Sequence, residues 1–337
     1  MKIQKQQSGG TAERQENMKD ESIFKIGVDI GGTNIAFGLL DVDLKIIVKK
    51  SVPFPRFDDG TPEKAEKTAE IIAEQSKDLC TEAKISYDAI ALIGICVPGS
   101  VDIESGTVID AYNLGFHNVP LKQMTEKLTG KPVLLQNDAD AAVKAEHRIG
   151  ALKNHKNGIL VTIGTGFGGG IIINDSLYRG GLGNGIELGH IQMDVHGEKC
   201  TCGRKGCIET LCSASWLKKQ AERLFEKKNP ALENYALNKS PLIDARALIE
   251  CVKTGDKECT EVWGIYLSNL ADALTSLINI LDPEIIAIGG GVSAAGDMLI
   301  KPVENLVLQR CFFKKHAEIA KAELGNDAGM TGSVIED

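Results

Sequence analysis

The chain has 337 residues, of which 43% are hydrophobic and 25% are charged. This is enough apolar material for one large domain or for two of ordinary size. Its 38 basic and 46 acidic residues give a formal net charge of −8, which disfavours a nucleic-acid partner, since duplex binders are usually basic. No apolar run is long enough for a transmembrane helix, so we predict a cytoplasmic protein with no membrane partner.

Residues 1–22 are polar and are predicted to form a flexible leader that is too short for a DNA-binding domain. The chain has nine cysteines. Most of them are scattered singly and no secretion signal precedes them, which is typical of reduced thiols in a cytosol.

The first half of the chain alternates strand and helix patterns. The run FKIGVD, a Gly-Gly-Thr turn and a second apolar run predict a strand–turn–strand unit within 24–40. The pattern then predicts strands at 44–53, 89–97 and 133–136 and helices at 61–83, 121–128 and 138–149.

The second half begins in the same way. A strand at 158–163, a glycine-rich turn at 164–170 and a strand at 170–173 repeat the unit seen at 26–40, which indicates a distant internal duplication. Residues 213–281 are largely helical in pattern, and a buried strand at 284–288 runs into three glycines. We therefore predict an α/β fold with domains at 23–136 and 137–337, the C-terminal helix being free to return to the first domain, and a ligand cleft between the domains.

The sequence VDIGGTN suits a phosphate site. Gly31 and Gly32 would let backbone N–H groups approach a phosphate, and Thr33 could add a hydroxyl donor. Asp29 could hold Mg²⁺ directly or through water. The alternative is a plain hairpin turn that begins with an Asp.

The sequence GTGFGGG is more specific, because a structural hairpin rarely needs so many positions without side chains. Gly164, Thr165, Gly166 and Gly168 are predicted to cradle a nucleotide phosphate. The segment lacks the Gly-Lys-Ser/Thr of a P-loop, and a strand follows it where a Rossmann site needs a helix.

The third glycine run, IGGGV, follows the last apolar strand. Gly290 and Gly291 could let a flat adenine lie on the backbone, and the alternative is a strand-to-helix turn.

The segment QNDADAA lies where a strand ends and a helix begins. Asn137 and Asp138 can act simply as helix caps. The functional hypothesis is that Asp138 accepts a proton from an attacking hydroxyl while Asn137 orients the substrate. Asp140 is the weaker candidate, because a residue two positions along a helix points about 200° away.

Cys200, Cys202 and Cys207 have C-x-C-x₄-C spacing, and His190 lies ten residues upstream of the first. This Cys₃His set is typical of a closed structural zinc site, with His196 and Cys212 as substitute ligands and a redox C-x-C as the main rival. Glu187 and Glu209 flank the cluster and could accept hydrogen bonds from sugar hydroxyls, as could the second ring nitrogen of His190. The alternative for both glutamates is a solvated surface position.

Taken together, these motifs resemble the ROK family of repressors and sugar kinases. The resemblance runs from about Ile23 to Ile335, and its motifs keep the order and spacing of the family. They are VDIGGTN, PGSVD, NDADAA, IGTGFGGGIII, RGGLGNGIELGH, CTCGRKGCIE and IGGGV.

The resemblance implies two actin-like (ribonuclease H-like) α/β domains, ATP and Mg²⁺ as cofactors with a structural Zn²⁺, and often a homodimer. It implies a catalytic base at Asp138. The implied sugar contacts are Asn113, Asn137, Glu187, His190 and Glu209. The implied zinc ligands are His190, Cys200, Cys202 and Cys207. The implied nucleotide-facing residues are Asp29, Gly31, Gly32, Thr33, the 164–170 loop, Gly290 and Gly291.

The chain departs from the family pattern at two positions. Asp140 stands where the family usually has Asn, and Tyr112 stands where it usually has Pro before the sugar-binding Asn113. Both changes leave the kinase chemistry intact and bear on the choice of sugar.

The function expected from the sequence is the ATP-dependent phosphorylation of a free hexose, with glucose 6-phosphate as the first choice of product. Allose, fructose, mannose and N-acetylmannosamine remain open as substrates, because specificity rests on a few hydrogen bonds to ring hydroxyls. The alternative from another class is a sugar-sensing regulator without catalysis, which would not need Asp138.

Overall fold

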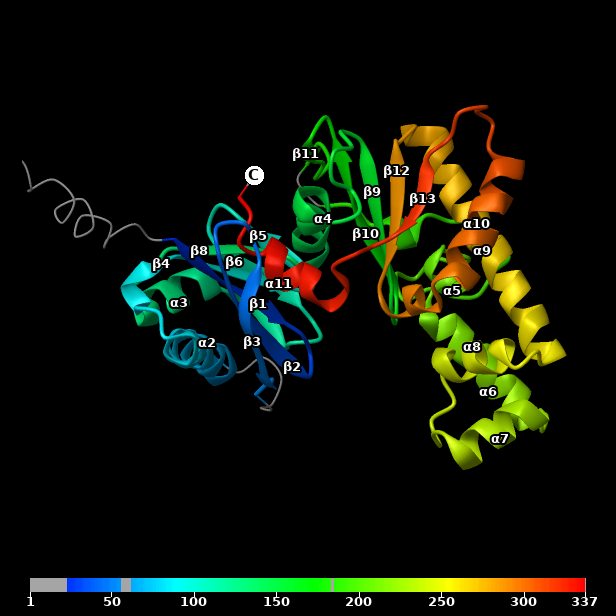
Figure 1. The fold of residues 1–337 in the computed structure, drawn as a ribbon, viewed down its shortest axis with the longest axis horizontal. Coiled ribbons are helices and arrows are strands. Elements are labelled where there is room, and N and C mark those ends of the chain that lie inside the picture. The colour runs from blue at the N-terminus through cyan, green and yellow to red at the C-terminus, as the bar shows by residue number, and fades with distance from the viewer. Residues whose placement is uncertain (1–22, 56–61, 183–184, 337) are drawn as a thin grey trace, which may run out of the picture. The chain divides into compact units, whose positions relative to one another are not determined.

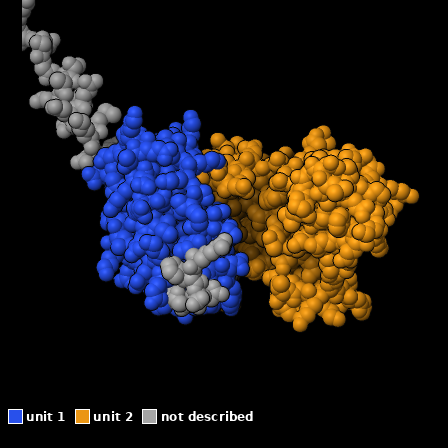
Figure 2. Space-filling view, turned by 90° about the horizontal axis from the view of Figure 1, so that it is seen from below, with its two compact units in different colours: residues 1–138, 336 blue, residues 139–335, 337 orange. Residues whose placement is uncertain are grey.

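The computed structural model describes residues 23–55, 62–182 and 185–336. The predicted leader at 1–22 lies outside the described residues. The chain divides into two compact units, which end and begin at Asp138 and Ala139, with Glu336 counted in the first unit (Figures 1 and 2).

The first unit is built on a five-stranded sheet with the order β3-β2-β1-β4-β8. β1, β2 and β3 pair antiparallel, whereas β1, β4 and β8 run parallel. The strands of this sheet are β1 (Phe24–Ile30), β2 (Asn34–Leu40), β3 (Ile46–Pro53), β4 (Ile90–Val97) and β8 (Val133–Asn137).

Among the described residues of the first unit, two helices and a small sheet accompany the large sheet. α2 (Pro62–Ala83) and α3 (Leu121–Thr129) lie side by side against the large sheet (Figure 1). The core between them holds Ile26, Val28, Ile72 and Leu79, all fully buried. The remaining elements are β5 (Ser100–Asp102), β6 (Thr107–Ala111), β7 (Phe116–Val119) and the 3₁₀ turn η1 (Tyr87–Ala89).

The second unit repeats this sheet, with the order β11-β10-β9-β12-β13. As in the first unit, the first three strands of this unit pair antiparallel, and its last two strands join in parallel. The strands are β9 (Gly158–Ile163), β10 (Phe167–Ile173), β11 (Ser176–Leu177), β12 (Ile285–Gly289) and β13 (Glu318–Lys321). The shared strand order supports the internal duplication predicted from the two strand–turn–strand units.

Four helices of the second unit lie within 213–281 and confirm the helical pattern predicted there. These four are α6 (Ala214–Glu226), α7 (Pro230–Asn238), α8 (Ala245–Lys253) and α9 (Lys257–Leu281). The other helices described in this unit are α4 (Asp138–Ile149), α5 (Glu209–Cys212), α10 (Asp297–Arg310) and α11 (Ala328–Gly332). Three 3₁₀ turns join them: η2 (Leu188–His190), η3 (Gly291–Ala295) and η4 (Gly325–Asp327).

Helix α9 is long and apolar enough, by length and composition, to cross a membrane. Half of its most apolar stretch is buried inside the unit. Trp263 and Tyr266 stack at 5.2 Å between ring centroids, and Leu270 and Leu274 are fully buried beside them. The buried apolar residues of α9 thus pack in the core of the second unit.

Helix α4 anchors the C-terminal segment of the chain through two buried charged side chains. The Glu146 carboxylate is fully buried and accepts hydrogen bonds from the backbone N–H groups of Ala151 and Leu324, both at 2.8 Å. Lys144 donates to the carbonyl of Ile335 at 3.0 Å. These contacts hold the N-terminal helix of the unit against its last residues.

Candidate active site and metal centre

The carboxyl edge of the first sheet gathers polar side chains from three parallel strands. Asp29 of β1 is the register partner of Cys96 of β4, and Val97 is the partner of Asn137 of β8. Asp138 follows Asn137 directly and is the first residue of α4. Because parallel strands end at the same edge, Asp29, Cys96, Asn137 and Asp138 come together there, which is where open α/β sheets commonly bind ligands.

Two carboxylates act on one buried thiol at this edge. Cys96 is fully buried, and burial, together with the negative charges of Asp29 and Asp138, raises the pKa of its thiol well above the usual range. The thiol therefore stays protonated and donates a hydrogen bond to Asp29. Burial raises the pKa of Asp29, and this hydrogen bond opposes the shift.

Neighbouring loops of the first unit bring further predicted residues to the same edge. The Asn137 side chain donates from Nδ2 to the Gly99 carbonyl at 2.9 Å. The backbone of Asn113 packs against Gly32, since a Cβ built on Gly32 would lie 3.4 Å from the Asn113 carbonyl oxygen. The turn at Gly31–Thr33 and the predicted sugar residue Asn113 are thus direct neighbours.

Tyr112, which departs from the family pattern, is 78% exposed. Its ring packs edge-on against His117 at 5.7 Å between centroids. His117 in turn contacts the Asp110 carboxylate through Nδ1 at 2.7 Å. The Tyr112 ring therefore lies at the surface, against a side chain of β7.

The glycine-rich turn of the second unit is shorter than predicted. β10 begins at Phe167, so that the turn comprises Gly164–Gly166, and Gly168 lies within the strand opposite Thr162. Continued antiparallel pairing with β9 accounts for this difference, because the glycines at 168–170 keep their ladder hydrogen bonds.

The short turn is held from several sides. The Ser215 hydroxyl donates to the Thr165 carbonyl at 2.6 Å, and the Ala214 N–H donates to the Gly164 carbonyl at 2.9 Å. Glu209 accepts the Phe167 N–H at 3.2 Å through Oε2. Glycine at 166 leaves room for this contact, because a Cβ at this position would lie too close to the same Glu209 oxygen and would make the carboxylate move.

The third glycine run turns sharply after β12. Gly290 has a φ of +78°, and a Cβ added to it would lie 2.5 Å from the Ile163 carbonyl oxygen. Both the backbone angle and the contact exclude a larger residue. This places Gly290 beside the end of β9, next to the turn at Gly164–Gly166.

The four residues predicted to bind metal do converge. The ligand atoms of His190, Cys200, Cys202 and Cys207 all lie within 4.8 Å of one another. The Sγ atoms of Cys202 and Cys207 are 3.7 Å apart, and Cys200 Sγ lies 3.5 Å from His190 Nδ1. Tetrahedral zinc with ordinary bond lengths would need about 3.8 Å and about 3.6 Å for these separations, so the residues present fit the ion.

The thiols of the cluster differ in environment. Cys207 is fully buried, and burial together with the neighbouring thiols of Cys202 and Cys200 raises its pKa to about 12. Cys202 is exposed, and the N–H of Arg204 lowers its pKa. Neither His196 nor Cys212, the substitutes considered from sequence, belongs to this cluster. Cys212 is instead fully buried in the core of the second unit.

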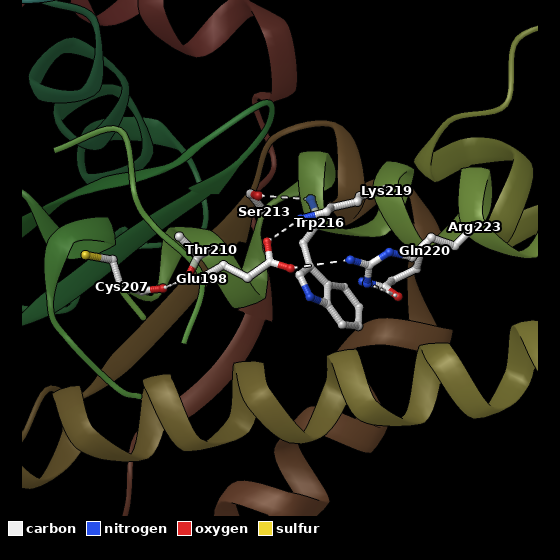
Figure 3. A network of polar contacts seen from close by, with 8 residues as sticks. All are labelled: Glu198, Cys207, Thr210, Ser213, Trp216, Lys219, Gln220 and Arg223. Atoms are coloured by element: carbon white, nitrogen blue, oxygen red, sulfur yellow. Dashed lines mark hydrogen bonds and ion pairs between the residues drawn. The ribbon is translucent and has the colours of Figure 1, made fainter. Parts of the chain in front are cut away.

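A polar network joins the metal-binding loop to helix α6 (Figure 3). Glu198 forms ion pairs with Lys219 and Arg223, and the Lys219 hydrogen bond is the main cause of the lowered pKa of Glu198. A pocket of about 300 Å³ opens between this loop, the turn and the start of α6. It is lined by residues that include Thr165, Gly166, Cys200, Thr201, Glu209, Ser213 and Trp216.

Glu209 connects the parts of this pocket. Its Oε2 accepts the Phe167 N–H of the glycine hairpin, while its Oε1 accepts the Thr201 hydroxyl at 3.3 Å. Glu187, the other predicted glutamate, is exposed and precedes η2, with its carbonyl accepting the His190 N–H at 3.1 Å. Glu187 thus borders the metal cluster, whereas Glu209 joins that cluster to the turn.

Sequence reasoning missed two residues that contact candidate site residues, one in each unit. Cys96 gave no signal, because one Cys in an apolar strand looks like core. Arg179 was passed over inside a glycine-rich segment, yet its Nε donates to Asp140 Oδ2 at 3.2 Å. An unexplained acid at Asp140 was the available clue that a cation had to lie nearby.

Comparisons with known proteins show what the chain is similar to. The chain matches the sequence profile of the ROK family over residues 25–335. It is 35% identical over 318 residues to a glucokinase of Thermotoga maritima, covering 93% of this chain and 97% of the relative. A xylose repressor of Bacillus spizizenii is 29% identical over 338 residues, covering 99% of this chain and 82% of the repressor.

A solved structure extends the comparison to the fold. A ROK family glucokinase from Streptomyces griseus in complex with glucose and AMPPNP superimposes with a TM-score of 0.76 at 31% identity, covering 92% of this chain and 97% of that one. The chain therefore belongs to the ROK family, and its two α/β units have the actin-like ATPase fold.

Proposed function

We propose that this chain, an ATP-dependent hexose kinase of the ROK family, phosphorylates glucose on its C6 hydroxyl. The observation that carries the proposal is the pair of carboxylates, Asp29 and Asp138, gathered around Cys96 beside the Gly31–Thr33 turn. The glucokinase relatives support glucose as the substrate.

In this proposal Asp138 is the catalytic base. As the glucose C6 oxygen forms its bond to the γ-phosphorus and the bond to the β–γ bridging oxygen breaks, the hydroxyl proton passes to the Asp138 carboxylate, and ADP leaves. Asn113, Asn137, Glu187, His190 and Glu209 are proposed as the sugar contacts. Asp138 is the first residue of α4, and a carboxylate held at a helix start offers a fixed geometry for this proton transfer.

The nucleotide is proposed to bind at the glycine turns. The backbone N–H groups of Gly31, Gly32, Gly164 and Gly166, with the hydroxyls of Thr33 and Thr165, would face the phosphates. Gly290 and Gly291 would lie near adenine. Gly168, within β10, would support the turn from the strand. Mg²⁺, held by Asp29, would supply charge neutralisation for the transferred group.

The Cys₃His cluster is proposed to hold a structural zinc ion. All four ligand positions come from the protein, so no position remains open for substrate, and the ion would fix the loop that carries His190 and Glu209. His190 contacts the cluster through Nδ1, which leaves Nε2 on the other side of the ring for the proposed hydrogen bond to sugar.

A sugar-responsive regulator is the second candidate, because xylose repressors match nearly the whole chain. Such a protein needs a sugar site and a conformational response but no base. The carboxylate of Asp138 beside the buried Cys96 favours the kinase, since a catalytic base is needed for phosphoryl transfer and not for sensing alone.

The test is ATP-dependent phosphorylation across a panel of hexoses and N-acetylhexosamines with Mg²⁺, run on the full chain and on Asp138→Asn. We expect turnover that favours glucose and collapses in the variant. Sugar binding without turnover in the unaltered chain would overturn the kinase proposal in favour of the regulator. Preference for another hexose would overturn the choice of glucose alone.

A further inference from the structure

The geometry points to the Asp140–Arg179 ion pair as a positioning device for sugar binding, and this inference rests on the function proposed above. The pair joins the helix that begins with Asp138 to the segment that leads to Glu187. Neither residue is proposed to touch the sugar or the nucleotide. Their role would be to set where Glu187 and His190 stand.

The pair is shielded from water. Arg179 Nε donates to Asp140 Oδ2 at 3.2 Å, and the side chains are 23% and 16% exposed. The ion pair between Arg310 and Asp272 in the same unit is less shielded, at 29% and 52%. Because water screens charges less at a partly buried site, the Asp140–Arg179 contact should be stronger than a typical surface pair.

The backbone at Arg179 and at the residue before it is hydrogen-bonded to two other parts of the chain, so the ion pair can affect their positions. One residue earlier, the Tyr178 N–H donates to the Ile171 carbonyl at 2.8 Å, which fixes the chain to β10. The Arg179 carbonyl itself accepts the Gly185 N–H at 3.1 Å. Holding Arg179 therefore also holds Gly185.

Gly185 leads directly to the proposed sugar residues. Glu187 lies two residues beyond Gly185, and its carbonyl accepts the His190 N–H at 3.1 Å. His190 is in turn a member of the metal cluster. Glu187 thus lies between Gly185, which is hydrogen-bonded to Arg179, and His190, which belongs to the metal cluster.

Asp140 stands where the family pattern has Asn. An Asn oxygen could accept the same hydrogen bond but would bring no charge, and charge-assisted hydrogen bonds are roughly twice as strong as neutral ones. In this chain the stronger contact would hold the segment more firmly, and the residue at 140 would tune sugar affinity without entering the site.

The experiment compares Asp140→Asn, Arg179→Gln and the double variant with Arg310→Gln, the matched control for removing an arginine from an ion pair in the same unit. We expect Arg179→Gln to raise the KM for glucose about tenfold. The value of kcat and the KM for ATP should stay within about twofold to threefold. Asp140→Asn should have a smaller effect, and the double variant should be no worse than Arg179→Gln alone.

Glucose binding without ATP, measured by calorimetry on the same variants, separates this inference from the kinase proposal. If the unaltered chain binds glucose without turnover, the kinase proposal fails, and the order of the dissociation constants still tests the pair. Equal glucose affinities for Arg179→Gln and Arg310→Gln would overturn the positioning role. Additive effects of Asp140→Asn and Arg179→Gln in the double variant would also overturn it. An increase in the KM for ATP as large as that in the KM for glucose would overturn it too, because it would indicate a general loss of order in the unit.

Discussion

The two five-stranded sheets share one strand order but carry different side chains at equivalent positions. In the first unit the next-to-last residue of β1 is Asp29, and its parallel neighbour on β4 is Cys96. In the second unit the corresponding residue of β9 is Thr162, and its parallel neighbour on β12 is Gly289. The same topology therefore presents a carboxylate beside a thiol in one half and a hydroxyl beside a glycine in the other.

The difference suits different roles for the two hairpins in the proposed function. Around β1 the carboxylates of Asp29 and Asp138 are proposed to hold the metal and to accept the proton. Around β9 the short turn is braced by Glu209 and Ser215, and its glycines offer N–H groups. A duplicated fold can specialise in this way because the sheet order sets the positions and leaves the side chains free to vary.

The largest expected effect comes from removing the base. Asp138→Asn keeps the size of the side chain and its capacity to cap α4 but cannot accept the proton, so kcat should fall by about 10²–10⁴-fold. Glucose affinity should stay within about tenfold. Steady-state kinetics and calorimetry check the two halves of this expectation, and an equal loss of turnover and affinity would assign Asp138 to binding.

The second prediction concerns the metal loop. Cys202→Ser removes one of four ligands, so zinc content should fall from about one ion per chain to well below it, and the melting temperature should drop by about 5–10 °C. Metal analysis and thermal unfolding measure this. Cys311→Ser, in the same unit and outside the cluster, is the control, and equal zinc content in both variants would contradict a zinc site.

The third prediction addresses the braced turn. Gly166→Ala would make the Glu209 carboxylate move and so break its hydrogen bond to the Phe167 N–H, which braces the turn, and we expect the KM for ATP to rise about tenfold. Gly264→Ala, where an added Cβ on α9 meets nothing within 4 Å, is the matched control and should leave the kinetics unchanged. A Gly166→Ala enzyme with an unaltered KM for ATP would show that the turn does not contact the nucleotide.

Much of the fold could be predicted from the sequence, because glycine turns between apolar runs mark hairpins clearly. The predicted strand at 44–53 and helix at 138–149 agree closely with β3 and α4. The turn at 164–170 was predicted too long, since glycines within a strand look the same in sequence as glycines in a loop. Only the pairing of Gly168 with Thr162 separates the two.

The site was predictable where spacing along the chain carries the geometry. The Cys₃His cluster is nearly local, with three of its ligands between Cys200 and Cys207, and all four converge as expected. Cys96 and Arg179 were not predictable, because their partners lie far away in sequence. Asp29 is 67 residues from Cys96 by numbering, and only the parallel pairing of β1 with β4 brings them together.

The smallest expected effect is a change in the pH dependence of folding stability when Asp29, at the carboxyl edge of the first sheet, is replaced. Because burial raises the pKa of Asp29 above its ordinary 3.8, the folded protein releases this proton at a higher pH than the unfolded chain does. The folded state is therefore progressively destabilised as the pH rises from about 4 through the folded pKa, and the cost is fully present above it.

Asp29→Asn removes that cost, so the variant should melt a few degrees higher than the unaltered chain at pH 7, with a smaller difference near pH 4. Asp43→Asn, at an exposed position, should show no such pH-dependent gain. Adding ATP with Mg²⁺ should then raise the melting temperature of the unaltered chain more than that of Asp29→Asn, since ligand binding stabilises only what it binds. A variant that is less stable at pH 7 and equally stabilised by ATP would mean that Asp29 supports the sheet edge and holds no metal, so that the two hairpins would differ less than their side chains suggest.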